Sequence, residues 1–149
     1  MAEGFTQKEC IDYHETFSPI SNKDSLRIIM ALVAHFNLKL HQMNVKTTFL
    51  NGDLEEGVYM KQPEGFNDNS QKACKLKKSI YGLKQASGQW SIKFHKVTTS
   101  YGFIEKFVDQ CIYLKVSGSK VIFLVLYVDD ILLASSDLGL LHEIKQFLS

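Results

Sequence analysis

The chain of 149 residues is long enough for one domain with its own core. Its composition, 45% hydrophobic and 22% charged residues, is typical of a folded protein. The formal net charge of +1 does not by itself indicate a nucleic-acid partner, and the three cysteines lack the spacing of a disulfide framework or a zinc site. These features exclude disordered and disulfide-rich secreted proteins, and they predict a soluble intracellular chain. No membrane partner is expected, because the longest apolar run is too short to span a bilayer.

The first half of the chain predicts one helix followed by short strands. Residues 23–36 carry apolar side chains at helical spacing, and the Ser-x-x-Asp spacing of residues 21–24 resembles a capping box at its start. A strand is predicted at residues 38–45, before the turn signal Asn51-Gly52. The remaining predicted elements are strands at residues 58–60, 73–81, 111–116 and 121–127 and helices at 85–101 and 138–148.

The order of these elements predicts the fold class. Helices and hairpins alternate without the regular strand–helix–strand pattern of a parallel sheet. We therefore expect an α+β fold, with an antiparallel sheet covered by helices on one face. The other face of such a sheet can accept a large ligand.

Residues 121–131, VIFLVLYVDDI, hold the chemistry that stands out most. An apolar strand runs directly into Asp129 and Asp130, and a second apolar strand follows, so both carboxylates are expected at a hairpin tip. Adjacent like charges repel unless a cation lies between them. Oxygen ligands of this kind suit Mg²⁺ together with substrate phosphates. Two interpretations stay open from these residues alone, a metal site and an ordinary acidic turn.

Positive charge gathers in the middle of the chain. Residues 69–104 contain seven lysines and no acidic residue. Such a block is typical of a surface that faces phosphates. A solvated face with no ligand would have the same composition, so both interpretations stay open.

Four segments together resemble one family, the reverse transcriptase domain of copia-type LTR retrotransposon Pol polyproteins. The matching segments are GFTQKECIDYHETFSP (residues 4–19), FLNGDLEEGVYMKQPEGF (49–66), CKLKKSIYGLKQA (74–86) and YVDDI (127–131). They occur in the family's order and spacing over nearly the whole chain. The resemblance implies a partial right-hand polymerase fold over residues 1–149. It would comprise a fingers remnant at about 1–22 and a palm at about 23–149, with an inserted fingers hairpin at about 56–82.

The resemblance implies an RNA-directed DNA polymerase that transfers dNTPs to a primer 3′-hydroxyl with two Mg²⁺ ions. Three carboxylates hold these ions in the family, and Asp129 and Asp130 match two of them. The third position lies in MNVKT (residues 43–47) and is occupied by Asn44, which brings no charge. If that carboxylate contributes a few kcal/mol, its loss costs roughly 10²–10⁴ in rate, so we expect degenerate catalysis rather than an enzyme adapted to asparagine.

Other family positions carry over to this chain. Backbone amides at Thr47 and Thr48 would bind the triphosphate. Phe49 would lie under the sugar and reject a 2′-hydroxyl. Gln85 would contact nucleotide and template, and Tyr127 would line the primer end. Each side chain has a purely structural alternative: a core Phe49, a polar helix start at Gln85 and a buried strand residue at Tyr127. The lysines expected to contact nucleic acid are Lys75, Lys77, Lys78 and Lys84.

Three departures from the family also favour an inactive fragment. Ser87-Gly88 replaces the usual Pro-Arg, the basic fingers strand upstream is missing, and no thumb or ribonuclease H follows within the chain. The resemblance implies RNA/DNA template-primer, dNTPs and other Pol domains as partners, in a cytoplasmic particle or the nucleus. The alternative function is a non-catalytic nucleic-acid- or protein-binding module that retains the palm scaffold.

Overall fold

The computed structural model of the chain describes residues 6–9, 11, 13, 20–54, 57–62, 65, 73–106 and 109–149. Most of the predicted fingers remnant, and residues 66–72 of the predicted fingers hairpin, lie outside these residues. The chain divides into two compact units, which are described separately. Unit 1 comprises Met1–Ser18 and Thr47–Lys93, and unit 2 comprises Pro19–Lys46 and Phe94–Ser149.

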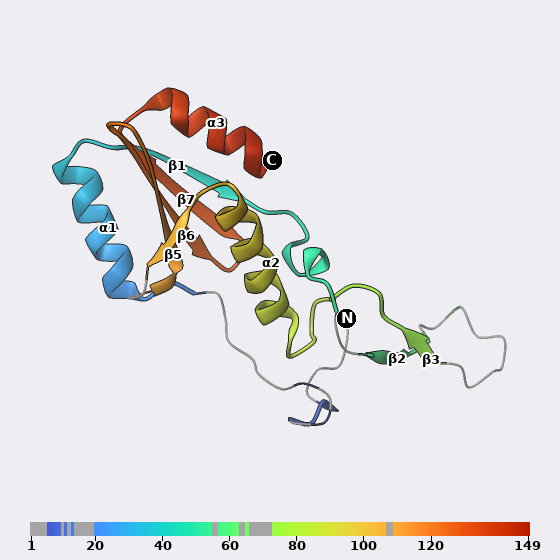
Figure 1. The fold of residues 1–149 in the computed structure, drawn as a ribbon. Helices are drawn as coiled ribbons and strands as arrows, with labels where there is room; N and C mark the ends of the chain where they lie inside the picture. The colour runs from blue at the N-terminus through green and yellow to red at the C-terminus, as the bar shows by residue number, and fades with distance from the viewer. Residues whose placement is uncertain are drawn as a thin grey trace. The chain divides into compact units, whose positions relative to one another are not determined.

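Unit 2 is built on a five-stranded sheet with the strand order β1-β7-β6-β5-β4, and every neighbouring pair is antiparallel (Figure 1). The strands are β1 (Lys39–Asn44), β4 (Ile104–Lys106), β5 (Asp109–Ser117), β6 (Lys120–Tyr127) and β7 (Asp130–Ser135). β6 and β7 form the hairpin predicted around the two aspartates. The central strands are the most apolar ones, and Leu124 and Leu133, which pair across them, are fully buried.

Helices pack on both faces of this sheet. In helix α1 (Lys23–His35), Ile29 packs in one cluster with Ile112 and Val125. In the C-terminal part of α2 (Ala86–Ser100), the Phe94 ring lies 5.8 Å from the ring of Tyr113. Ile112 and Tyr113 are consecutive residues of β5, so their side chains point to opposite faces.

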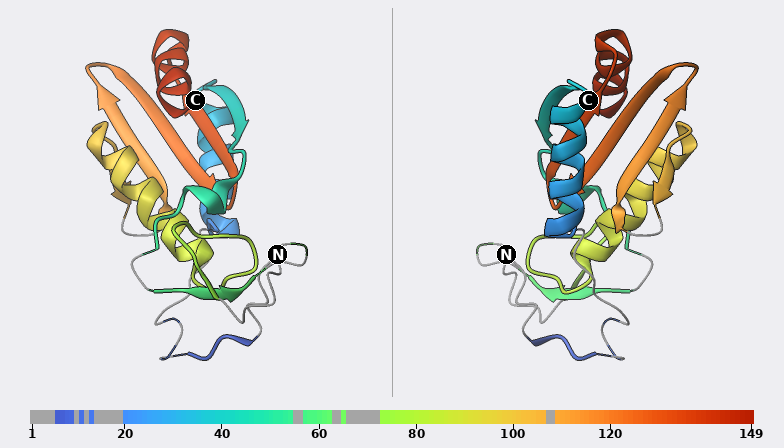
Figure 2. Two further views of the ribbon diagram at one scale, coloured as in Figure 1. Left: turned by 90° about the vertical axis from the view of Figure 1, so that its right-hand side faces the viewer. Right: turned by 90° about the vertical axis from the view of Figure 1, so that its left-hand side faces the viewer.

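The α+β class with an antiparallel sheet is thereby confirmed, and one detail differs from the prediction. Helices were expected on one face only, whereas α1 and α2 lie on different faces. The reason is visible in the strand sequences, since β6 is apolar at consecutive positions, and a strand buried on both faces needs cover on both. The third helix, α3 (Leu138–Leu148), contacts β7 and β6 (Figure 2). None of the helices within the described residues has the length and apolar character needed to cross a bilayer.

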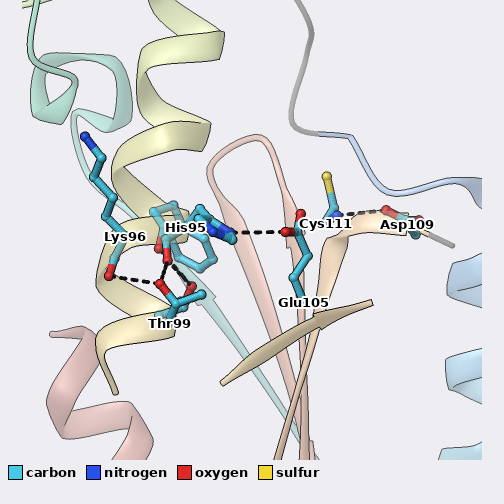
Figure 3. A network of polar contacts seen from close by, with 8 residues as sticks. His95, Lys96, Thr99, Glu105, Asp109 and Cys111 are labelled. Atoms are coloured by element: carbon cyan, nitrogen blue, oxygen red, sulfur yellow. Dashed lines mark hydrogen bonds and ion pairs between the residues drawn. The ribbon is translucent and has the colours of Figure 1, made fainter. Parts of the chain in front are cut away.

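The start of α1 is held by residues that the capping-box pattern did not identify. Asn22, not Ser21, is the N-cap, and its side chain accepts a hydrogen bond from the Asp24 N–H at 3.0 Å. Ser21 is free for another role, since its hydroxyl donates to Asp109 Oδ2 at 2.8 Å. The Asn22 N–H also donates to the Asp109 carboxylate at 2.8 Å. The Cys111 N–H donates to it at 2.9 Å (Figure 3). One buried carboxylate therefore joins the start of α1 to the start of β5.

Unit 1 contains a short antiparallel pair, β2 (Tyr59–Lys61) with β3 (Ala73–Lys75), and a 3₁₀ helix, η2 (Thr48–Asn51). The predicted pairing of these strands is present, and their assignment to the fingers stays a prediction. Gly52 follows η2 in close contact with α2, because a Cβ at this position would lie 3.0 Å from Gln89 Cβ. A side chain at Gly52 would therefore need α2 to shift by a few tenths of an ångström.

Candidate active site

The two aspartates lie at the turn between β6 and β7. Tyr127 and Asp130 form the last pair of the β6–β7 ladder, which leaves Val128 and Asp129 as the turn residues. Val128 has a φ of +58°, a conformation that costs a β-branched residue about 1–2 kcal/mol. The pairing also extends beyond β1, because the Val45 N–H donates to the Asp129 carbonyl at 2.8 Å. The flanking ladders thus hold a strained turn in a fixed position.

Asn44 lies directly opposite Asp130 in the β1–β7 register. Its Nδ2 donates to Asp130 Oδ1 at 3.3 Å, so the amide is a hydrogen-bond donor to the carboxylate. Its match to a third carboxylate of the family stays a prediction. Gln42 lies two residues earlier on β1, on the same face of the sheet, and its Nε2 donates to the same oxygen at 3.2 Å. Gln42 belongs to no predicted motif, although period-two alternation from Asn44 places it on this face of the sheet.

The turn carries two acidic side chains, and what they could bind follows from their number and burial. Asp129 and Asp130 are half-buried, and two carboxylates are enough for one divalent cation that also binds substrate phosphates. Within the described part of the chain, no three His, Cys, Asp or Glu side chains gather into a group that could hold a metal. An asparagine carbonyl can be a neutral ligand, but here its amide N–H faces Asp130. The turn therefore offers the carboxylate oxygens of Asp129 and Asp130 as possible ligands, and a cation held by them is a proposal.

Tyr127 precedes the turn with its side chain 47% exposed, so the alternative of a buried strand tyrosine does not hold. The backbone of Tyr127 forms an antiparallel bridge with Ile20. Ile20 directly precedes Ser21 and Asn22, which donate hydrogen bonds to Asp109. The buried Asp109 carboxylate thus holds the segment that lies beside Tyr127. Asp109 belongs to no sequence motif, because an isolated aspartate gives no pattern.

Residues 47–49, predicted to surround the nucleotide, belong to unit 1. Thr47 has a φ of +55° and precedes η2, and the Thr48 side chain is buried at 1% exposure. The Phe49 ring is half-buried and lies 4.8 Å from the ring of Tyr81. Phe49 is thus partly accessible and partly packed on an aromatic neighbour. Its predicted contact with the sugar stays a prediction.

Gln85 lies in a local network of unit 1. Its side chain is only 5% exposed, and Oε1 accepts a hydrogen bond from Gln7 Nε2 at 3.0 Å. Gln7 Oε1 in turn accepts from the Lys84 N–H at 2.8 Å. Gln7 stands in the family-like GFTQ segment, which was the available signal for it. The network joins two of the family-like segments, and direct contact of Gln85 with a nucleotide stays a prediction.

The four predicted nucleic-acid lysines are all exposed, but they differ in their partners. Lys78 Nζ forms an ion pair with Asp53 at 2.8 Å, and Lys93 Nζ pairs with the other oxygen of Asp53 at 2.7 Å. Hydrogen bonds from Lys78 and Lys93 lower the pKa of Asp53 to about 2. Lys78 is therefore partly neutralised by the protein itself, which leaves Lys75, Lys77 and Lys84 as the stronger candidates for phosphate contacts.

The chain matches a family model described as reverse transcriptase (RNA-dependent DNA polymerase) over residues 1–149. It is 46% identical, over its whole length and 11% of the relative, to a retrovirus-related Pol polyprotein from transposon TNT 1-94 of Nicotiana tabacum. It is also 36% identical to a retrovirus-related Pol polyprotein from transposon RE1 of Arabidopsis thaliana. This match covers the whole chain and 10% of the relative. The chain thus spans about a tenth of these relatives.

A shorter relative, a putative transposon Ty5-1 protein of Saccharomyces cerevisiae, is 32% identical over 72% of the chain and 35% of the relative. No solved structure matches the chain. The match of the family model confirms the resemblance drawn from the four segments. The chain therefore belongs to the reverse transcriptase (RNA-dependent DNA polymerase) family, as a reverse transcriptase segment of the kind found in copia-type retrotransposon Pol polyproteins.

Proposed function

We propose that the chain forms the palm of an RNA-directed DNA polymerase, that Asp129 and Asp130 are its catalytic carboxylates, and that Asn44 lowers its rate of nucleotidyl transfer. The observation that carries this proposal is the register of Asn44 with Asp130, together with the hydrogen bond between their side chains. This contact supports the assignment of Asn44 to the position of the third carboxylate.

Reverse transcriptases use divalent metal ions, and the ion expected here is Mg²⁺. When bound, Mg²⁺ activates the primer 3′-hydroxyl and neutralises charge on the triphosphate. Asp129 and Asp130 would hold it, because both side chains are half-buried at one turn and provide anionic oxygens. With the third carboxylate replaced by an amide, the site has one negative charge less for the ions that the family binds.

The consequence of Asn44 follows from that missing charge. Electrostatic groups preorganised around developing charge commonly contribute several kcal/mol to the transition state, so replacing one ligand carboxylate is expected to lower the rate by roughly 10²–10⁴. Asn44 retains a structural role, because its amide donates to Asp130 and holds that carboxylate against β1. The fold of the palm thus tolerates a substitution that the chemistry does not.

Substrate contacts are proposed for five further positions. Backbone amides at Thr47 and Thr48 would bind the triphosphate, and Phe49 would select deoxyribose by its ring. Tyr127 would line the primer end, which its exposure permits. Gln85, which lies in the network with Gln7, would act on nucleotide or template.

Lys75, Lys77 and Lys84 would contact the phosphates of an RNA/DNA template-primer, which requires exposed and mobile cations. Lys78 would add less, because Asp53 already pairs with it. The same exposed lysines would also suit a non-catalytic nucleic-acid-binding module, which is the second candidate function. Neutralising Lys75 and Lys77 should weaken salt-dependent binding of RNA–DNA duplex more than neutralising Lys78 does. Equal effects of the three lysines would contradict this ranking.

The catalytic assignment is tested by placing residues 1–149 in an active relative, in place of its corresponding segment. Asp129→Ala and Asp130→Ala should each abolish the residual Mg²⁺-dependent incorporation of dNTPs. Asp137→Ala is the matched control, because Asp137 is an aspartate near β7 that caps α3 and lies outside the turn. The purified chain alone should show no templated incorporation. Incorporation that survives Asp129→Ala would remove the proposed function.

A further inference from the structure

We propose that Gln42 is a positioning residue that holds the Asp130 carboxylate for binding of a divalent cation. This inference rests on the proposed function of Asp129 and Asp130. The direct observation is that Gln42 Nε2 and Asn44 Nδ2 donate to one and the same atom, Asp130 Oδ1, at 3.2 and 3.3 Å. Both donors stand on β1, the edge strand beside β7.

The chemical type of the two donors matters. A carboxylate has two oxygens and about four lone-pair positions, so two donors on Oδ1 leave Oδ2 available to a cation. The donors are neutral amides, which restrain the carboxylate without cancelling its negative charge. A lysine or arginine at position 42 would hold Asp130 equally well and would repel the cation. Gln42 therefore combines restraint with retention of charge.

Hydrogen bonds to a ligating carboxylate fix its orientation, and their removal typically weakens metal binding about 10–100-fold. The Gln42 contact is exposed to solvent and is backed by Asn44, so the lower end of this range applies when Asn44 is present. The two donors share one acceptor, and loss of either one leaves the other in place. Their effects should therefore depend on each other.

This dependence distinguishes the role of Gln42 from a general contribution to stability. In an Asn44→Asp variant the second donor is gone, and a new carboxylate lies opposite Asp130. Gln42 is then the remaining amide donor at Oδ1, and removing it should cost more than it does beside Asn44. A residue that merely stabilised β1 would have the same effect on cation affinity in both backgrounds.

The test measures Mn²⁺ binding by the full chain from the electron paramagnetic resonance signal of free Mn²⁺. Gln42→Met and Gln42→Leu, which remove the donor, are each introduced beside Asn44 and beside Asn44→Asp. We expect about 10-fold weaker Mn²⁺ binding beside Asn44 and about 30–100-fold weaker binding beside Asn44→Asp. Gln146→Met is the control, because Gln146 is an exposed glutamine of α3 and should leave Mn²⁺ binding unchanged.

The outcomes separate this inference from the proposed function. Mn²⁺ affinities within twofold of the parent in both backgrounds, or no Mn²⁺ binding by any variant, would overturn the role of Gln42. If Gln42→Met weakens Mn²⁺ binding while Asn44→Asp leaves templated incorporation unchanged in the grafted enzyme, the role of Gln42 stands and the assignment of position 44 fails. Equal losses from Gln42→Met and Gln42→Leu exclude an effect particular to one replacement side chain.

Discussion

Asp109 is expected to contribute more to the stability of the fold than any exposed acid of unit 2. Its carboxylate is 9% exposed and accepts hydrogen bonds from the Ser21 hydroxyl and from the N–H groups of Asn22 and Cys111. Asp109→Ala leaves all three donors without this acceptor. At about 1–2 kcal/mol for each donor, allowing for water that reaches the part-buried Asn22 N–H, the loss is about 3–5 kcal/mol of unfolding free energy.

Asp109→Asn refines this estimate. The asparagine keeps one carbonyl oxygen, and the Ser21 hydroxyl can rotate to accept a hydrogen bond from its NH₂ group. One backbone N–H then faces an NH₂ group instead of an oxygen, so the loss should be about 1–2 kcal/mol. Asp24→Ala is the control, because Asp24 is exposed and its ion pair with Arg27 at 3.4 Å contributes at most about 1 kcal/mol.

Urea unfolding followed by circular dichroism measures all three variants. The predicted order of stability is wild type and Asp24→Ala together, then Asp109→Asn, then Asp109→Ala. A loss below about 1 kcal/mol in Asp109→Ala would refute the reasoning, because it would mean that the three donors find equally good partners elsewhere. A loss in Asp109→Asn equal to that in Asp109→Ala would show that the charge, not the number of acceptor oxygens, stabilises this site.

Two further predictions concern a titration and a strained turn. Asp53 has its pKa lowered from 3.8 to about 2, so its contribution to stability is present above pH 3.8 and is lost as the pH falls towards 2. An NMR titration should give a pKa near 2 for the Asp53 carboxyl, and this pKa should return towards 3.8 in a Lys78→Met, Lys93→Met double variant. A wild-type pKa of 3.8 would contradict the two ion pairs. Val128→Gly removes left-handed strain of about 1–2 kcal/mol and adds an entropy cost of folding of about 0.5–1 kcal/mol, so stability should rise by about 0–1.5 kcal/mol. Val125→Gly, at a residue 2% exposed in the preceding strand β6, should cost about 3 kcal/mol or more, and equal losses from the two glycines would rule out strain at Val128.

The sequence predicted most of the fold because its strongest patterns are local. The helix at residues 23–36 and the β6–β7 hairpin follow from apolar periodicity and from turn residues, and both are present. Packing of helices on both faces of the sheet could have been expected from the unbroken apolar run of β6. The N-cap was assigned to Ser21 instead of Asn22, because the pattern in residues 21–24 cannot show that Asp109 attracts the Ser21 hydroxyl.

The residues of the candidate site were likewise predictable from the sequence only in part. Asp129, Asp130 and the position of Asn44 followed from motifs, and the structure adds that Asn44 is in register with Asp130. Gln42 was missed because its significance depends on strand register, which brings residues 88 positions apart into contact. The Gln7 contact to Gln85 also joins segments far apart in the chain. Such pairings arise from tertiary structure, and no local pattern encodes them.

The central claim is that Asn44 occupies the position of a catalytic carboxylate. The most direct measurement is the single-turnover rate of Mg²⁺-dependent dNTP incorporation in the grafted enzyme, compared between Asn44 and Asn44→Asp at saturating template-primer. The account predicts a rate increase of roughly 10²–10⁴ for Asn44→Asp, which Asp129→Ala should abolish. An unchanged rate in Asn44→Asp, with the fold intact, would contradict the claim.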